Sequence, residues 1–130
     1  MRPHSNDRRN QYDRRRKKRY RVREGAYAAL INHDHRLGQI RDISLVGLSF
    51  RYIGAEETID SESVLKIILA GSGLMMDDLP YHTVSDYEIE SEHALSSLQI
   101  RQMHLAFGEL SAQQLTRLDE FILNYSMGEA

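Results

Sequence analysis

Short apolar segments separated by polar turns make up the chain from Ala26 to about residue 107. Several of them alternate apolar and polar residues in the period of a β-strand, as residues 48–53 (LSFRYI) do. The segments that predict strands are residues 27–31, 37–43, 48–53, 64–69, 81–89 and 98–107. Six strands at near-regular spacing favour a small antiparallel barrel or sandwich over a parallel α/β sheet.

Two details of this pattern bear on the core and on the loops. Ile40 and Ile43 are the residues of the second segment expected to face inward. The segment from Gly71 to Pro80 is expected to be a loop, because glycines open it and a proline ends it. Within that loop, the pair Met75-Met76 fits either an exposed contact or a core residue.

The last apolar pattern has a helical period. Ser111 and Gln114 have the spacing of a capping box, in which each side chain bonds the other residue's backbone N–H. The apolar residues that follow recur every three or four positions and predict an amphipathic helix over about residues 111–126, with Gly128 as a stop signal. They are Leu115, Leu118, Phe121, Ile122 and Tyr125. This stripe predicts packing on the β-structure, with a dimer surface as the alternative.

Charge divides the chain sharply. Residues 1–24 hold eleven of the seventeen Lys and Arg residues and three acids, a net charge of +8, whereas residues 25–130 carry −10. Residues 1–13 are polar without an apolar period, so we expect a flexible basic arm there. A single domain is expected over residues 14–127, with the barrel at about 20–108. A cationic arm on an acidic body implies an anionic partner that binds at one place.

Other features exclude several classes of protein. The chain has no cysteine, so disulfides and thiolate metal sites are ruled out and a cytoplasmic location is expected. No apolar run reaches the roughly 18 residues of a membrane span, and the charged N-terminus lacks the apolar stretch of a signal peptide. His33-Asp34-His35 is better explained as a hairpin tip than as a metal site. No catalytic set or phosphate-binding loop is evident, so neither an enzyme nor a bound cofactor is expected.

Two motifs stand at the junction of arm and body. Arg15 and Arg19 form R-x-x-x-R, and Asp42, Ser44 and Gly47 form D-x-S-x-x-G. Together, at this separation, they resemble the PilZ domain, a bacterial receptor for cyclic di-GMP. The resemblance extends to residues 20–22 and to residues 103–110 before the helix. It implies a six-stranded antiparallel β-barrel with a C-terminal helix, and a protein effector as a further partner.

The chemistry of these residues agrees with that resemblance. Arginine donates two parallel hydrogen bonds to a phosphate or to guanine O6 and N7, so Arg15 and Arg19 are expected to clamp the ligand. Guanine's Watson–Crick edge presents N–H donors that a carboxylate accepts, which suits Asp42. Ser44 is expected to add a smaller donor and acceptor, while Gly47 allows a tight turn or a close backbone approach.

Several alternatives remain open. Arg14, which precedes the motif, offers a further planar cation, and we hypothesise that it supports two stacked ligands per chain. The arm alone would also fit a polyanion-binding or nucleic-acid-binding module, although no specific nucleic acid is expected. A PilZ-fold interaction adaptor that binds no nucleotide is a third possibility. Asp42 and Ser44 would also suit an ordinary polar β-turn.

Overall fold

A computed structural model describes residues 18–31, 35–54, 64–89 and 99–130 of the chain. The elements in chain order are β1 (Tyr20–Val22), β2 (Ala26–Ile31), β3 (His35–Ile43), β4 (Gly47–Ile53), β5 (Val64–Leu69), β6 (Gly73–Leu79), β7 (Tyr81–Glu88), β8 (Ile100–Phe107), α2 (Ala112–Tyr125) and β9 (Ser126–Glu129). The predicted arm over residues 1–13 lies outside the described residues, so it stays a prediction, as does the single domain over 14–127.

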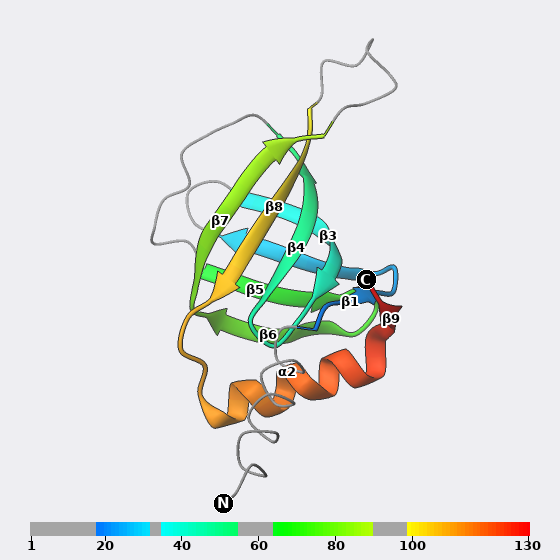
Figure 1. The fold of residues 1–130 in the computed structure, drawn as a ribbon, viewed down its shortest axis with the longest axis vertical. Helices are drawn as coiled ribbons and strands as arrows, with labels where there is room; N and C mark the ends of the chain where they lie inside the picture. Colours follow the sequence, from blue (N-terminus) through cyan, green and yellow to red (C-terminus); the bar gives the residue numbers. More distant parts are fainter. Residues whose placement is uncertain (1–17, 32–34, 55–63, 90–98) are drawn as a thin grey trace, which may run out of the picture.

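The described strands form one antiparallel sheet that curls into an open half-barrel (Figure 1). The strand order is β6-β5-β2-β3-β4-β8-β7, and β1 pairs with β3 on one side and β9 on the other. An antiparallel β-structure with one C-terminal helix is therefore confirmed. A closed six-stranded barrel is not confirmed, because no pairing joins the end strands β6 and β7 within the part of the chain that the structure describes.

Strand β6 corrects the prediction of a loop between Gly71 and Pro80. Residues 73–79 pair with β5, but the register shifts twice along this pair, which removes the regular alternation from the sequence. At the end of β6, Asp78 has φ 54° and Pro80 lacks an N–H, so the chain turns sharply into β7. Met76 is buried at 3% exposure, while Met75 packs against the edge of the core.

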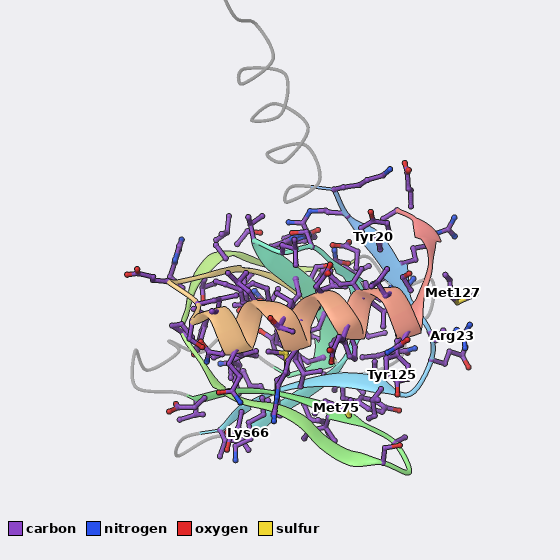
Figure 2. All side chains as sticks on the ribbon, turned by 90° about the horizontal axis from the view of Figure 1, so that it is seen from below. Tyr20, Arg23, Lys66, Met75, Tyr125 and Met127 are labelled. Carbon is purple, nitrogen blue, oxygen red and sulfur yellow. The ribbon has the colours of Figure 1, made fainter. Side chains whose placement is uncertain are left out.

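The core lies on the concave side of the curled sheet. Alternate residues of the central strands point into it, and Leu48 and Phe50 of β4 are fully buried. Helix α2 lies across the sheet (Figure 2) and contributes Leu118, Phe121 and Ile122 to this core. Burying each such side chain contributes roughly 1.5–3 kcal/mol. The helical stripe is therefore part of the core, as predicted.

Both ends of α2 have identifiable causes. The capping box is confirmed: the Ser111 hydroxyl accepts from the Gln114 N–H at 3.1 Å, and the Gln114 side chain accepts from the Ser111 N–H at 2.9 Å. The helix ends at Tyr125 because Ser126 is extended and starts β9. The prediction that Gly128 stops the helix is wrong, since that glycine lies within β9 at φ 119°.

None of the described helices is long and apolar enough to span a membrane.

Candidate ligand-binding surface

A β-bulge in β3 sets the direction of Asp42. Ile40 and Ile43 are both buried, although residues three apart on a regular strand face opposite sides. The register of β3 against β4 shifts between Ile40 and Asp42, and this irregularity reconciles the two positions. Because Asp42 pairs with Ser49 while Ile43 pairs with the core residue Leu48, the Asp42 side chain lies on the outer face of the sheet.

Asp42 forms an ion pair with Arg19 on this outer face. Arg19 Nη1 donates to Asp42 Oδ1, across 23 positions of sequence. The Arg19 side chain is 40% exposed and that of Asp42 is 20% exposed, so both groups remain within reach of a solute. At such exposure an ion pair contributes only about 0–1 kcal/mol, so a ligand can displace it at small cost.

The two strands that flank β1 hold Arg19 in place. On one side Arg21 pairs with Asp42 of β3, and on the other the N–H of Ala130 donates to the carbonyl of Arg19 at 3.0 Å. Lys18 forms an ion pair with Glu129 of β9, and hydrogen bonding to that carboxylate raises the pKa of Lys18. The start of β1 is thereby fixed where the basic segment joins the body.

Ser44 builds the turn between β3 and β4. Its hydroxyl accepts from the N–H groups of Val46 at 3.1 Å and Gly47 at 3.2 Å, and its own N–H donates to the carbonyl of Gly47 at 2.8 Å. Ser44 is completely buried. The hydroxyl therefore orders the turn behind Asp42 and does not project from the surface.

Gly47 is required by a close approach of β4 to β8. A Cβ added there would lie 2.2 Å from the backbone oxygen of Leu105, a distance that no side chain tolerates. Gly47 therefore lies at a close approach between two strands, while the role predicted for it in a ligand site stays a prediction. Gly47 allows the turn to sit directly against β8.

No protein-family model matches the sequence, and no curated protein matches it either. Among solved structures, the chain is similar to the PilZ domain of YcgR from Escherichia coli, solved with c-di-GMP (cyclic di-GMP). The TM-score is 0.64 at 13% identity, covering 85% of this chain and 90% of that one.

The chain has a PilZ-like fold. It is also similar to MrkH of K. pneumonia, in the complex with c-di-GMP (TM-score 0.60, 17% identity) and in the apo state (TM-score 0.59, 15% identity). These matches cover 85% and 82% of this chain but only 51% and 47% of MrkH. The chain therefore corresponds to about half of that protein.

On this PilZ-like fold, the predicted site residues fall into three groups. Arg19 and Asp42 meet at the surface. Ser44 and Gly47 shape the turn beneath them. Arg14 and Arg15 lie outside the described residues, so their roles stay predictions.

The sequence did not predict a second polar cluster, on the concave side of the PilZ-like sheet. The hydroxyl of Tyr52 donates to the Asp86 carboxylate at 2.7 Å and accepts from Arg36 at 2.7 Å. Arg101, 5% exposed, donates to the same carboxylate at 3.1 Å.

The contacts within this cluster shift two pKa values. The pKa of Tyr52 is raised, mainly by burial of its hydroxyl and secondly by the hydrogen bond to Asp86. Burial opposes the charge on Arg101, but its bonds to Tyr52 and Asp86 outweigh that and raise its pKa. The sequence feature that could have revealed this cluster is an arginine, Arg101, at an inward-facing position of β8.

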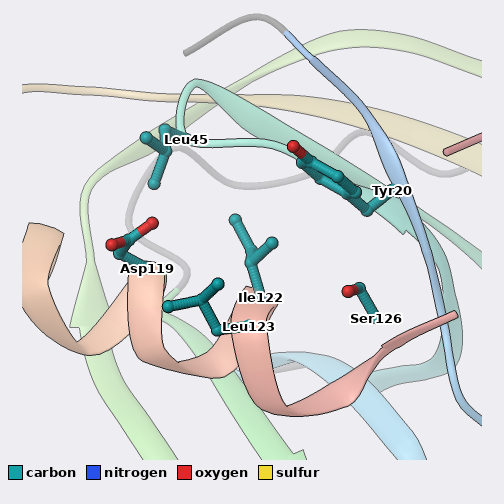
Figure 3. Close-up of a pocket in the computed structure, with 6 residues that line it drawn as sticks. All are labelled: Tyr20, Leu45, Asp119, Ile122, Leu123 and Ser126. Atoms are coloured by element: carbon teal, nitrogen blue, oxygen red, sulfur yellow. The ribbon is translucent and has the colours of Figure 1, made fainter. Parts of the chain in front are cut away.

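A small pocket adjoins the turn of the PilZ-like fold (Figure 3). It has a volume of about 110 Å³ and lies between Tyr20 of β1, Leu45 of the turn and the C-terminal half of α2. The helix contributes Asp119, Ile122 and the 68% exposed Leu123. The pocket therefore adjoins β1 and the β3–β4 turn, next to which Arg19 and Asp42 lie, but α2 supplies half of its lining residues. No group of three metal-ligating side chains is found among the described residues.

Proposed function

We propose that the protein is a receptor for cyclic di-GMP. The observation that carries this proposal is the surface ion pair of Arg19 and Asp42, at the junction of the basic segment with a PilZ-like fold. The solved structures of the YcgR PilZ domain and of MrkH with c-di-GMP support the same ligand.

The two side chains complement different parts of the ligand. Asp42 accepts hydrogen bonds from the N–H donors of a guanine edge, which arginine cannot do. Arg19 donates two parallel bonds to a phosphate or to guanine O6 and N7. Without ligand, each side chain is the partner of the other. Binding therefore exchanges one weak ion pair for several charge-assisted bonds of roughly 1.5–3 kcal/mol each.

The arm completes the site in this proposal. Arg15 joins Arg19 in clamping the ligand, and Arg14 supports a second, stacked ligand. Ordering such a segment costs on the order of 2–5 kcal/mol, which the new bonds outweigh when several form. Ser44 and Gly47 contribute by fixing the turn beneath Asp42. The ordered arm then presents a new surface to a protein effector in bacterial cytoplasmic signalling.

Isothermal titration of the full chain with cyclic di-GMP, GTP and a short oligonucleotide tests the proposal. We expect cyclic di-GMP to bind, and Arg15→Ala, Arg19→Ala or Asp42→Ala to abolish binding while the unfolding transition is retained. Arg23→Ala is the matched control, because Arg23 is an exposed cation four positions after Arg19 whose hydrogen bond within the described residues runs from its backbone N–H to the carbonyl of Tyr125. Full binding by Arg19→Ala would show that the clamp is wrong. One ligand per chain would contradict the stacked pair.

A second candidate is a polyanion-binding module, favoured by the net charge of +8 on residues 1–24. MrkH has been described as a c-di-GMP-dependent transcription regulatory factor, so a nucleic-acid partner for a protein of this fold is chemically reasonable. This function would be favoured if the oligonucleotide binds and Asp42→Ala leaves its affinity unchanged.

A further inference from the structure

A groove runs along helix α2 on the side that faces strand β6. It consists of a smaller cavity of about 140 Å³ and a larger one of about 250 Å³, and both are lined by Met76 of the strand and Arg117 of the helix. Because they share these two residues, the cavities are parts of one feature, which we call the α2–β6 groove. Its strand side is made by residues 75–77 and its helix side by residues between 113 and 125.

This groove is separate from the pocket beside Leu45. That pocket takes Asp119 and Leu123 from α2, whereas the α2–β6 groove takes Arg117 and Phe121. Successive residues of a helix are turned by about 100°, so these two pairs lie on opposite sides of α2. The groove therefore faces away from the pocket that adjoins the β3–β4 turn.

Strand β6 gives the groove an open backbone edge. It is an end strand of the sheet and pairs with β5, while no strand pairs with its other edge within the part of the chain that the structure describes. Such an edge presents N–H and C=O groups with which an extended peptide can pair. The two register shifts in β6 interrupt this edge, so side chains must supply part of the recognition.

The larger cavity has an apolar floor. Met76 and Phe121 form its base at 3% and 2% exposure, and the half-buried Met75 and Tyr125 line it on the β6 side of α2 (Figure 2). The rings of Phe121 and Tyr125 are 5.2 Å apart between centroids. Thioether side chains are flexible and adapt to apolar groups of different shape. The floor therefore suits an apolar side chain, and the Met75-Met76 pair serves the core and the groove together.

The smaller cavity offers an uncompensated positive charge. Asp77 lines it but forms an ion pair with Lys66 at 3.3 Å. Arg117 is exposed, and its side chain has no ion pair or hydrogen bond among the described residues. Glu120, one turn further along the helix, lines only the larger cavity. Since a guanidinium donates two parallel bonds to a carboxylate, the smaller cavity suits an acidic side chain.

The length of the groove matches a short extended segment. Residues 113 and 125 stand roughly 18 Å apart along the helix at 1.5 Å per residue. An extended chain advances about 3.3 Å per residue, so about five residues fill the groove.

We propose that the α2–β6 groove binds an extended, acidic and apolar peptide segment of a partner protein. The segment places a carboxylate at Arg117 and an apolar side chain over Met75 and Tyr125, and its backbone pairs with the open edge of β6. This inference goes beyond the proposed function, because no step of it requires cyclic di-GMP.

Selection of a phage-displayed library of random octapeptides on the full chain, without cyclic di-GMP, tests the proposal. We expect enriched peptides to share an acidic residue near an apolar one within an alternating pattern. A failure to enrich any peptide over an uncoated surface would overturn the inference. Since the selection contains no nucleotide, that result would leave the proposed function standing, and a failure to bind cyclic di-GMP would leave the groove standing.

Fluorescence anisotropy with a synthetic copy of the enriched peptide then locates its site. Arg117→Glu is expected to weaken binding at least about tenfold, through loss of charge-assisted bonds. Met75→Ala is expected to weaken it by about threefold to tenfold, through loss of apolar contact. The matched controls are Arg51→Glu, at an exposed arginine of β4, and Leu123→Ala, on the opposite side of α2. Full affinity of Arg117→Glu, or an equal loss in Arg51→Glu, would show that the peptide binds elsewhere.

Backbone pairing with β6 has its own test. In a strand added to an edge, alternate peptide N–H groups point toward that edge and the others point away. Methylation of one alternate set of peptide nitrogens is therefore expected to weaken binding at least about tenfold, and methylation of the other set by less than about threefold. Equal affinities of the two methylated peptides would show that the peptide does not pair with β6.

Discussion

At the scale of single residues, the D-x-S-x-x-G motif divides into one surface group and two groups that support it. Asp42 faces outward and reaches Arg19. Ser44 is buried and bonds two backbone N–H groups of its own turn. Gly47 lies where only hydrogen fits against β8. The spacing of this motif therefore reflects the construction of a turn as much as contact with a ligand.

Gly47→Ala tests that construction. The added Cβ would meet the backbone oxygen of Leu105 at 2.2 Å, and a backbone group in the centre of the sheet cannot move aside cheaply. We expect the free energy of unfolding to fall by about 2–3 kcal/mol in urea titration, as for other overpacked sites. Gly54→Ala is the control, because the added Cβ would lie 3.4 Å from an atom of the Tyr52 ring, which is ordinary van der Waals contact, and little loss is expected. Equal stability of the two variants would contradict the explanation.

At the scale of elements, strand β9 links the helix to the base of the arm. It follows α2 directly, pairs with β1 and bonds Arg19 through the backbone of Ala130. The pocket beside Leu45 lies between the same elements. A movement of Arg19 would therefore displace the paired strand β9 and, through it, the C-terminal end of α2.

Removal of residues 126–130 tests this link. Strand β1 is only three residues long and would lose one of its two partners, so its amides are expected to exchange hydrogen much faster. Affinity for cyclic di-GMP is expected to fall as Arg19 loses its fixed position. Glu129→Gln is the control: it removes the ion pair with Lys18 but keeps the strand, and an exposed pair contributes little. Unchanged exchange in β1 after the truncation would show that β9 does not hold it.

At the scale of the whole molecule, the segregation of charge separates the two candidate functions. The segment of residues 1–24 carries +8 and the rest of the chain −10. A small dianionic ligand meets only a few of these cations, whereas a polyanion would meet many and release condensed counterions as it binds.

The dependence of affinity on salt follows from this difference. Between 50 and 200 mM salt we expect the affinity for cyclic di-GMP to fall by less than about tenfold, and any affinity for an oligonucleotide to fall by roughly a thousandfold or more if six or more phosphates are contacted. Fluorescence anisotropy at several salt concentrations measures both. Equally steep losses for the two ligands would favour the polyanion function.

Much of the fold could be predicted from the sequence, because the signals were local. The capping box at Ser111 and Gln114 needs residues only three positions apart, and the helix lies within one residue of its predicted bounds. Strand β6 could not be predicted, since its bulges break the period on which such a prediction rests. The cluster of Tyr52, Asp86 and Arg101 joins residues 15 and 34 positions apart, which no short-range pattern reveals.

The sequence by itself determined the apolar alternation, the terminal helix, the basic segment and the two motifs. Only the tertiary structure decided that Arg19 meets Asp42 and that Ser44 is buried. The physical reason is register: a slip of one residue in strand pairing turns every side chain to the opposite face. The bulge between Ile40 and Asp42 sets that register, and through it the outward direction of Asp42.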